Sequence, residues 1–391
     1  MMNILFISYT AVSLCKGSVR AAAMLRALAD AGHRVDLVAP YADLPDHPHI
    51  RVLAGSGGVP LCRIKLRMVG LRAAGRGSYD AIHAVDESVF FAMRLCRWKK
   101  VPLVYDASRC FSGKVGSGTS SLWRFFPKHL QRLEAKVLER ADIVFSPCSV
   151  LTADLYGMGQ ASVVQLEDIP AQPLYARQDA DRSILPGLAG KRPVLSSSKG
   201  PVLSSSKRPG PVVVCSALPG HSVGFRKLLM ATRKVVDAVP GAVFFFKGAP
   251  HGQAEKMAAN LDIADHCVFL SPNDPETFLS ALAIADVVLM VPHGESRYIH
   301  PQVYTLLHAG APLVTIHHAA YDEILTEKTS VHLLPNSESI AEGLLRVIQE
   351  PLFSLAVSLE GQQLVAARHT YSSFKHKVRM TYHQLANTQL I

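Results

Sequence analysis

The chain has 391 residues, of which 49% are hydrophobic and 18% charged, with a mean hydropathy of +0.18. This length suits two or three domains, and the apolar content excludes a chain that is disordered throughout. No apolar run reaches the ~18 residues that a membrane-spanning helix needs, and no positive charge precedes the first apolar run as in a signal peptide. We therefore expect a soluble cytoplasmic protein.

The cysteines and histidines are not spaced as in known metal-binding motifs. The seven cysteines are spread along the chain without a Cys-x-x-Cys pair, and the 17 histidines include no His-Glu-x-x-His motif. Neither a disulfide framework nor a zinc site is indicated. We expect no metal and no cofactor.

The net charge of +10 is concentrated in the first half of the chain. Residues 51–150 hold 17 Lys and Arg against 7 Asp and Glu, whereas residues 211–391 hold 13 against 15. A solvated basic face would explain this excess, and so would an anionic partner such as a membrane surface or a nucleic acid. Few aromatic residues lie among the basic ones, which favours the membrane surface over nucleic acid.

The first half alternates short apolar runs with helical patterns. A buried strand is predicted at Asn3–Ser8, then a polar turn at Tyr9–Gly17 and a helix at Val19–Ala31 that Ser18 caps. A longer helix is predicted at Ser120–Arg140. The further predicted strands are Val35–Ala39, Ala81–Ala84, Leu103–Tyr105, Ile143–Phe145 and Val163–Leu166. Alternation of this kind is typical of a parallel sheet with helices on both faces.

A Ser/Lys/Pro-rich segment interrupts this pattern at 175–210. Within it, Pro193–Lys199 and Pro201–Lys207 both read PVLSSSK. Such a composition cannot bury a core, so we predict an exposed linker.

The second half repeats the alternation and predicts a second parallel sheet. The predicted strands are Val212–Cys215, Val243–Phe246, Val268–Leu270, Val287–Val291, Leu313–Ile316 and Val331–Leu334. The predicted helices are Gly224–Ala238, Pro275–Ala285, Pro301–Ala309 and Ser337–Glu350. Two such sheets in succession indicate two α/β domains.

Several segments, taken in order, resemble the GT-B glycosyltransferases of the family 4 type. They include MNILFISYT with the helix after it, YDAIHAVDESVFFA, VPLVYDASRCF, VFLSPNDPETFLSALAIADVVLMVP and HPQVYTLLHAGAPLVT. The resemblance implies an α/β fold of two Rossmann-like domains facing across a cleft. It divides the chain into an acceptor-side domain, the linker, a donor-side domain and a C-terminal helix that crosses back to the first domain, at 1–174, 175–210, 211–365 and 366–391.

The resemblance also implies a function, which is transfer of a sugar from a nucleotide-diphosphate sugar to an acceptor glycan or a lipid-linked glycan. Backbone amides, helix N-termini and cations would stabilise the diphosphate leaving group. The donor-binding candidates are Gly17, His221, Arg226, Lys247, Gly248, Arg297, His300, Gln302, Tyr304, Thr305 and Gly310. The acceptor-side candidates are Asp106 and Arg109, with Asp106 also open to a structural role.

The chain departs from the family pattern at positions that bear on catalysis. Ser108 stands where many relatives have a histidine. Counting back from the turn Ala309–Pro312, Thr305 and Arg297 stand where relatives usually have two glutamates, with Glu295 close to the first. Ser108 and Glu295 are therefore the catalytic candidates.

These departures leave three functions open. The first is an active glycosyltransferase, located in the cytoplasm or on the cytoplasmic face of a membrane. The second is a catalytically degenerate GT-B protein that acts as a binding or scaffold subunit. The third is another GT-B chemistry such as sugar-nucleotide epimerisation, for which no motif is present. The sequence favours the first.

Overall fold

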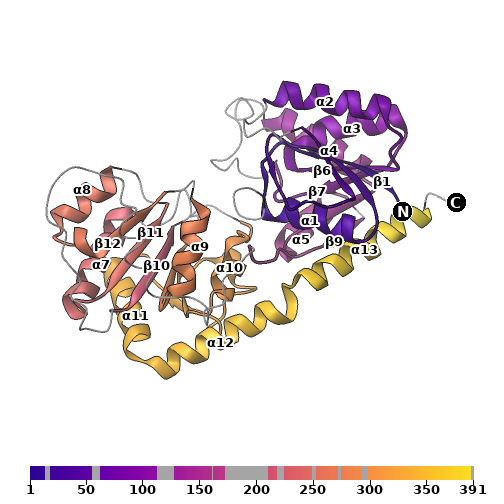
Figure 1. The fold of residues 1–391 in the computed structure, drawn as a ribbon. Helices are drawn as coiled ribbons and strands as arrows, with labels where there is room; N and C mark the ends of the chain where they lie inside the picture. Colours follow the sequence, from indigo (N-terminus) through magenta and orange to yellow (C-terminus); the bar gives the residue numbers. More distant parts are fainter. Residues whose placement is uncertain are drawn as a thin grey trace. The chain divides into compact units, whose positions relative to one another are not determined.

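The computed structural model describes residues 1–13, 18–54, 62–111, 127–160, 162–171, 210–217, 224–248, 252–271, 274–292 and 297–388. These residues fall into two compact units (Figure 1). Unit 1 comprises Met1–Gln172 and Arg368–Ile391, and unit 2 comprises Pro173–Ala367. Except for Gly210, the segment predicted as a linker lies outside the described residues.

Unit 1 is built on a parallel sheet of seven strands in the order β5-β3-β1-β6-β7-β8-β9. The strands are β1 Asn3–Ser8, β3 Arg34–Val38, β5 Ile50–Ala54, β6 Ala81–Val85, β7 Leu103–Asp106, β8 Ile143–Ser146 and β9 Val163–Gln165. A separate pair of short strands consists of β2 Val12–Ser13 and β4 Ala42–Asp43. Buried apolar runs such as that of β1 are expected where helices cover both faces of a parallel sheet.

Helices cover both faces of this sheet (Figure 1). Helices α1 and α13 pack together on one face, and α2, α3 and α4 follow one another on the other. The Ser18 side chain accepts a hydrogen bond from the backbone nitrogen of Ala21 and so begins α1. The bounds are α1 Val19–Asp30, α2 Arg63–Arg76, η1 Asp86–Ser88, α3 Val89–Lys99, α4 Pro127–Arg140, α5 Ser149–Gly157 and α13 Tyr371–Thr388.

Unit 2 contains a parallel sheet of six strands in the order β12-β11-β10-β13-β14-β15. The strands are β10 Val212–Ala217, β11 Val243–Lys247, β12 Cys267–Leu270, β13 Val287–Val291, β14 Leu313–Ile316 and β15 Val331–Leu333. The helices are α7 Phe225–Ala238, α8 Gln253–Asn260, η4 Ala264–His266, α9 Pro275–Ile284, α10 Gln302–His308, η5 Ala319–Tyr321, α11 Ser337–Gln349 and α12 Pro351–Arg368.

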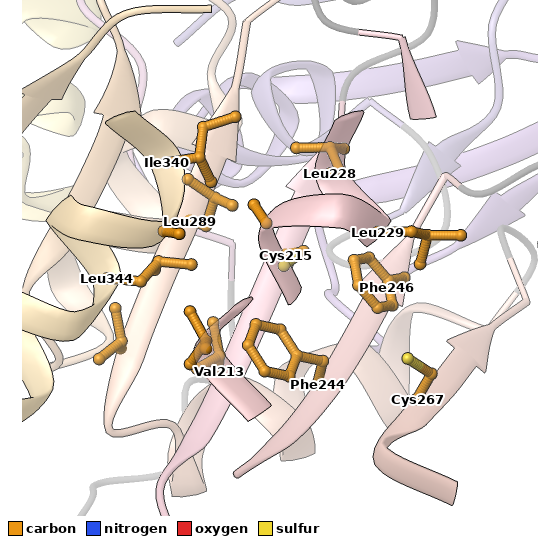
Figure 2. Close-up of a cluster of buried hydrophobic side chains, with 14 of the residues drawn as sticks. Val213, Cys215, Leu228, Leu229, Phe244, Phe246, Cys267, Leu289, Ile340 and Leu344 are labelled. Carbon is orange, nitrogen blue, oxygen red and sulfur yellow. The ribbon is translucent and has the colours of Figure 1, made fainter. Parts of the chain in front are cut away.

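The core of unit 2 lies between its sheet and two amphipathic helices (Figure 2). Leu228 of α7 and Leu344 of α11 are buried against strand residues that include Val213, Phe244 and Leu289. Burying apolar surface of this kind contributes about 25 cal/mol per Å². The α/β class and the two Rossmann-like parallel sheets predicted from the sequence are confirmed.

Candidate functional site

Both sheets have a topological switch point, where the strand order reverses. It lies between β1 and β6 in unit 1 and between β10 and β13 in unit 2. Ligands of open α/β sheets bind outside the carboxyl ends of the strands at such points. The loops that follow β10 and β13, at 218–223 and 293–296, lie outside the described residues. In unit 1, by contrast, the residues directly after β1, β6 and β7 are described, so the candidate site is built from that unit first.

A buried serine fixes the switch point of unit 1. The Ser88 hydroxyl lies 2.7 Å from the carbonyl oxygen of Ile7 at the end of β1, and 2.8 Å from that of Val85 at the end of β6. It also accepts a hydrogen bond from the backbone nitrogen of Val85. Asp86, directly after β6, has a φ of +47°, in the left-handed region that residues with a side chain seldom occupy. Such strain is often found at functional sites.

Ser108, the predicted catalytic candidate, is bound to this strained aspartate. The Asp86 carboxylate accepts a hydrogen bond from the Ser108 hydroxyl at 2.7 Å and another from the Ser108 backbone nitrogen at 2.9 Å. Sequence reasoning did not select Asp86. Its position directly after a buried strand is the signal that was available.

Next to this pair, a group of five side chains forms what we call the rim cluster: Tyr9, Arg63, Arg67, Glu87 and Arg109. The Arg63 guanidinium pairs with the Glu87 carboxylate at 2.6 Å, and that of Arg109 lies 4.0 Å from its other oxygen. Arg67 donates from Nε to the Tyr9 hydroxyl at 3.1 Å, and the Arg63 guanidinium carbon lies 5.6 Å from the centre of the Tyr9 ring. Helix α2 supplies two of the three arginines, and the loop after β7 supplies the third.

Asp106, predicted on the acceptor side, is 1% exposed and lies in a buried ion-pair network. It accepts a hydrogen bond from Arg20 Nε at 2.7 Å, while Arg20 Nη1 bonds Asp168 at 2.8 Å and the Leu166 carbonyl oxygen at 2.7 Å. Burial raises the pKa of Asp106 to about 6, although Arg20 opposes this shift. Asp106 therefore joins α1 to β7, an arrangement that fits the structural role left open above.

Lys247 is the most distinctive donor-side candidate in unit 2. It ends β11, the strand next to β10, and its Nζ lies 3.9 Å from the centre of the Phe278 ring. Burial lowers the pKa of Lys247 to about 8. No carboxylate among the described residues lies within ion-pair distance of its nitrogen, so its charge is available to a ligand. Gly248 follows with a φ of +86°, a conformation suited to glycine.

Four of the other candidates of unit 2 lie on α10 or directly before it. His300 Nδ1 accepts a hydrogen bond from the backbone nitrogen of Gln302 at 3.3 Å, which is a local contact between residues two apart in the chain. Tyr304 and Thr305 of α10 are 1% and 4% exposed, so their hydroxyls lie beneath the surface.

The remaining candidates are placed separately or lie outside the described residues. Arg297 is exposed before α10, Arg226 is exposed in the first turn of α7, and Gly310 has a φ of +78° at the turn before β14. Gly17, His221 and Glu295 lie outside the described residues, so their predicted roles stay predictions.

Two further observations on the described ranges concern other kinds of site. Within them, no group of three or more His, Cys, Asp or Glu side chains is arranged to hold a metal ion. A cavity of about 400 Å³ lies near the amino ends of β1, β3 and β5, lined by residues that include Arg34, His49 and Tyr79. This cavity contains none of the predicted site residues.

Solved structures with the same fold cover nearly the whole chain. Sucrose-phosphate synthase from Thermosynechococcus elongatus is 16% identical with a TM-score of 0.69, covering 99% of this chain and 100% of its own. HepE from Anabaena in complex with UDP-glucose is 15% identical, with a TM-score of 0.65 and coverage of 98% and 100%. UDP-GlcNAc 2-epimerase from Neisseria meningitidis bound to UDP-GlcNAc is 11% identical, with a TM-score of 0.57 and coverage of 98% and 100%. No curated protein sequence matches the chain.

These likenesses establish the class of protein: the chain has the GT-B fold, as its sequence predicted. Residues 17–167 match the family described as the glycosyl transferase 4-like domain. The matched residues lie in unit 1, and the resemblance predicted from the sequence is confirmed.

Proposed function

We propose that the chain is a glycosyltransferase that moves a sugar from a nucleotide-diphosphate sugar to a glycan acceptor, with the donor bound by unit 2 and the acceptor by unit 1. The observation that carries this proposal is the match of residues 17–167 to a glycosyltransferase family. It favours transfer over epimerisation, a reaction whose enzymes have the same fold. Solved structures of the same fold that contain UDP-glucose or UDP-GlcNAc support a nucleotide sugar as donor.

Lys247 supports retained donor chemistry. A cation held in a partly dehydrated position stabilises the charge that develops on a diphosphate leaving group more strongly than a fully solvated one does. Lys247 is desolvated, lies next to the switch point of unit 2 and has no ion-pair partner among the described residues. We assign it the role of binding the donor diphosphate, with Gly248 allowing close approach of the backbone.

Titration calorimetry of the full chain with UDP, GDP and ADP tests this proposal. We expect binding of at least one nucleotide, weakened roughly 10-fold or more by Lys247→Met, since a lost charge-assisted hydrogen bond costs about 1.5–3 kcal/mol. Lys256→Met, which removes an exposed lysine of α8 in the same unit, is the matched control and should leave affinity unchanged. Absence of binding at millimolar nucleotide would favour the degenerate scaffold instead.

We further propose that unit 1 lies against an anionic membrane on its cytoplasmic face through α2. Ile64, Met68 and Leu71, at helical spacing, are 71%, 47% and 47% exposed. Lys65 and Arg72 are exposed on the same helix, which has no acidic residue. Exposed apolar residues together with cations are typical of helices that lie in a membrane interface. Over the described part of the chain, no helix is long and apolar enough to cross a bilayer.

Sedimentation with vesicles tests this membrane proposal. The triple change Ile64→Ser, Met68→Ser and Leu71→Ser should abolish binding to vesicles of phosphatidylcholine and phosphatidylserine. Leu352→Ser on α12, where the side chain is 83% exposed, is the control for loss of a surface leucine. If the unsubstituted chain, the triple variant and Leu352→Ser all sediment with the vesicles to the same extent, α2 is excluded as the membrane contact.

A further inference from the structure

We propose that the rim cluster binds a phosphate group of the acceptor between Arg63, Arg67 and Arg109. This inference rests on the proposed function, and it specifies the acceptor as a phosphorylated molecule. The cluster lies at the carboxyl ends of β6 and β7 and beside the end of β1, where an open α/β sheet binds its ligands.

The rim cluster has more positive than negative charge. It contains three guanidinium groups and one carboxylate, that of Glu87. The neighbouring Asp86 carboxylate is already bonded to two donors of Ser108. A neutral sugar would be bound by hydroxyl and amide groups and would gain little from this excess, whereas a phosphate would neutralise it.

The arginines are partly exposed and retain donors that have no hydrogen-bond partner among the described residues. The Arg63 and Arg109 side chains are 50% and 37% exposed, so both open to solvent while they contact Glu87. Arg109 Nε is buried and has no hydrogen-bond partner among the described residues. Arg67 donates to Tyr9 through Nε. Its two terminal nitrogens have no hydrogen-bond partner among the described residues and can donate to a ligand. Guanidinium groups suit the oxygens of a phosphate because they donate in a fork.

The cluster is also held in place before any ligand binds. Arg63 and Arg67 lie one helical turn apart on α2, and their guanidinium carbons lie 5.6 and 5.9 Å from the centre of the Tyr9 ring. Glu87, whose side chain is 14% exposed, holds the Arg63 guanidinium at the switch point. A site arranged in this way loses less side-chain entropy when a ligand binds. Glu87 then competes with the phosphate for the same guanidinium groups.

Two probes of the full chain, without donor, test the proposal and distinguish the sources of phosphate. The soluble probe is glycerol 2-phosphate, followed through the arginine Nε–Hε NMR signals. The lipid probe is 10% phosphatidic acid in phosphatidylcholine vesicles, followed by sedimentation. Arg63→Gln, Arg67→Gln and Arg109→Gln should each weaken binding about 10-fold or more. Arg379→Gln, which removes an exposed arginine of α13, is the matched control.

Glu87→Gln gives a test that a merely structural role would fail. Removal of the competing carboxylate should strengthen phosphate binding several-fold, whereas loss of a purely structural ion pair would weaken it or leave it unchanged. Circular dichroism of each variant verifies that unit 1 is folded.

The outcomes are distinct. The proposal is supported if either probe binds, if its binding depends on the three arginines, and if that binding is stronger in Glu87→Gln. The probe that binds then identifies the phosphate source as soluble or lipid. Failure of both probes overturns it, and so does binding that Arg379→Gln weakens as much as the cluster variants do. Because no nucleotide is present, a failure here is separable from a failure of nucleotide binding by Lys247.

Discussion

Nδ1 of His83 lies 2.7 Å from the hydroxyl of Tyr382, which connects the central strand β6 to the C-terminal helix α13. Both side chains are fully buried, and the His83 ring stacks on Phe6 with 4.5 Å between ring centres. Burial lowers the pKa of His83 to about 3, and the nearby charge of Arg20 adds to this shift. The imidazole is therefore neutral in the folded protein at physiological pH.

The first prediction concerns the pH dependence of stability. The folded-state pKa of His83 lies below the ordinary value of 6.5, so the unfolded chain takes up the proton first. The contribution of His83 to stability is complete above about pH 6.5 and is lost as the pH falls, by up to about 1.4 kcal/mol per pH unit. Urea unfolding of unit 1 between pH 7.5 and 5 should show this slope.

Two variants separate the titration of His83 from its hydrogen bond. His83→Phe should reduce the slope, whereas Tyr382→Phe removes the hydrogen bond and should retain the slope at lower overall stability. If the slope is the same in His83→Phe as in the natural chain, His83 is not the group that titrates.

The second prediction concerns donor affinity and pH. Because burial lowers the pKa of Lys247 to about 8, its charge is lost as the pH rises through that value. We expect affinity for UDP to fall roughly tenfold from pH 7 to pH 9. Lys247→Arg, which stays charged over this range, should bind UDP with little change. Parallel pH profiles for both proteins, measured by calorimetry, would exclude Lys247 from the diphosphate site.

The third prediction concerns the strained residue at the switch point. Asp86→Ala loses both hydrogen bonds to Ser108 and keeps a Cβ at a φ of +47°. Asp86→Gly loses the same bonds but tolerates that φ, so it should be more stable than Asp86→Ala by about 1 kcal/mol. Both variants should lower transfer activity alike, because both release Ser108. Equal unfolding midpoints would show that the backbone at Asp86 relaxes in the alanine variant.

The fourth prediction concerns the start of the sheet in unit 2. A Cβ added to Gly210 would overlap the backbone carbonyl of Gly241, which cannot move without displacing the start of β11. We expect Gly210→Ala to destabilise unit 2 by about 1–3 kcal/mol. Gly224→Ala is the control: its Cβ would meet nothing within 4 Å, so only the preference of the helix N-cap for glycine over alanine is lost, roughly 0.5–1 kcal/mol. Thermal unfolding of the two variants makes the comparison.

Local patterns in the sequence were enough to predict most of the strands. Asn3–Ser8, Val287–Val291 and Leu313–Ile316 have the predicted bounds, because a run of apolar residues between turn residues leaves few alternatives. The strand Ile50–Ala54 was not predicted, since its partly exposed residues lack a clear apolar run. The helix Arg63–Arg76 was also not named, because its apolar residues face solvent as well as the core.

The sequence by itself determined the α/β class, the succession of most strands along the chain and the position of Ser108 and Arg109 after a buried strand. Only the tertiary structure decided what these two residues contact, because their partners Asp86 and Glu87 lie about twenty positions earlier in the chain. A parallel sheet places the carboxyl ends of β6 and β7 side by side through a long crossover connection. Side chains that are distant in sequence meet there, and their charges and hydrogen bonds depend on that meeting.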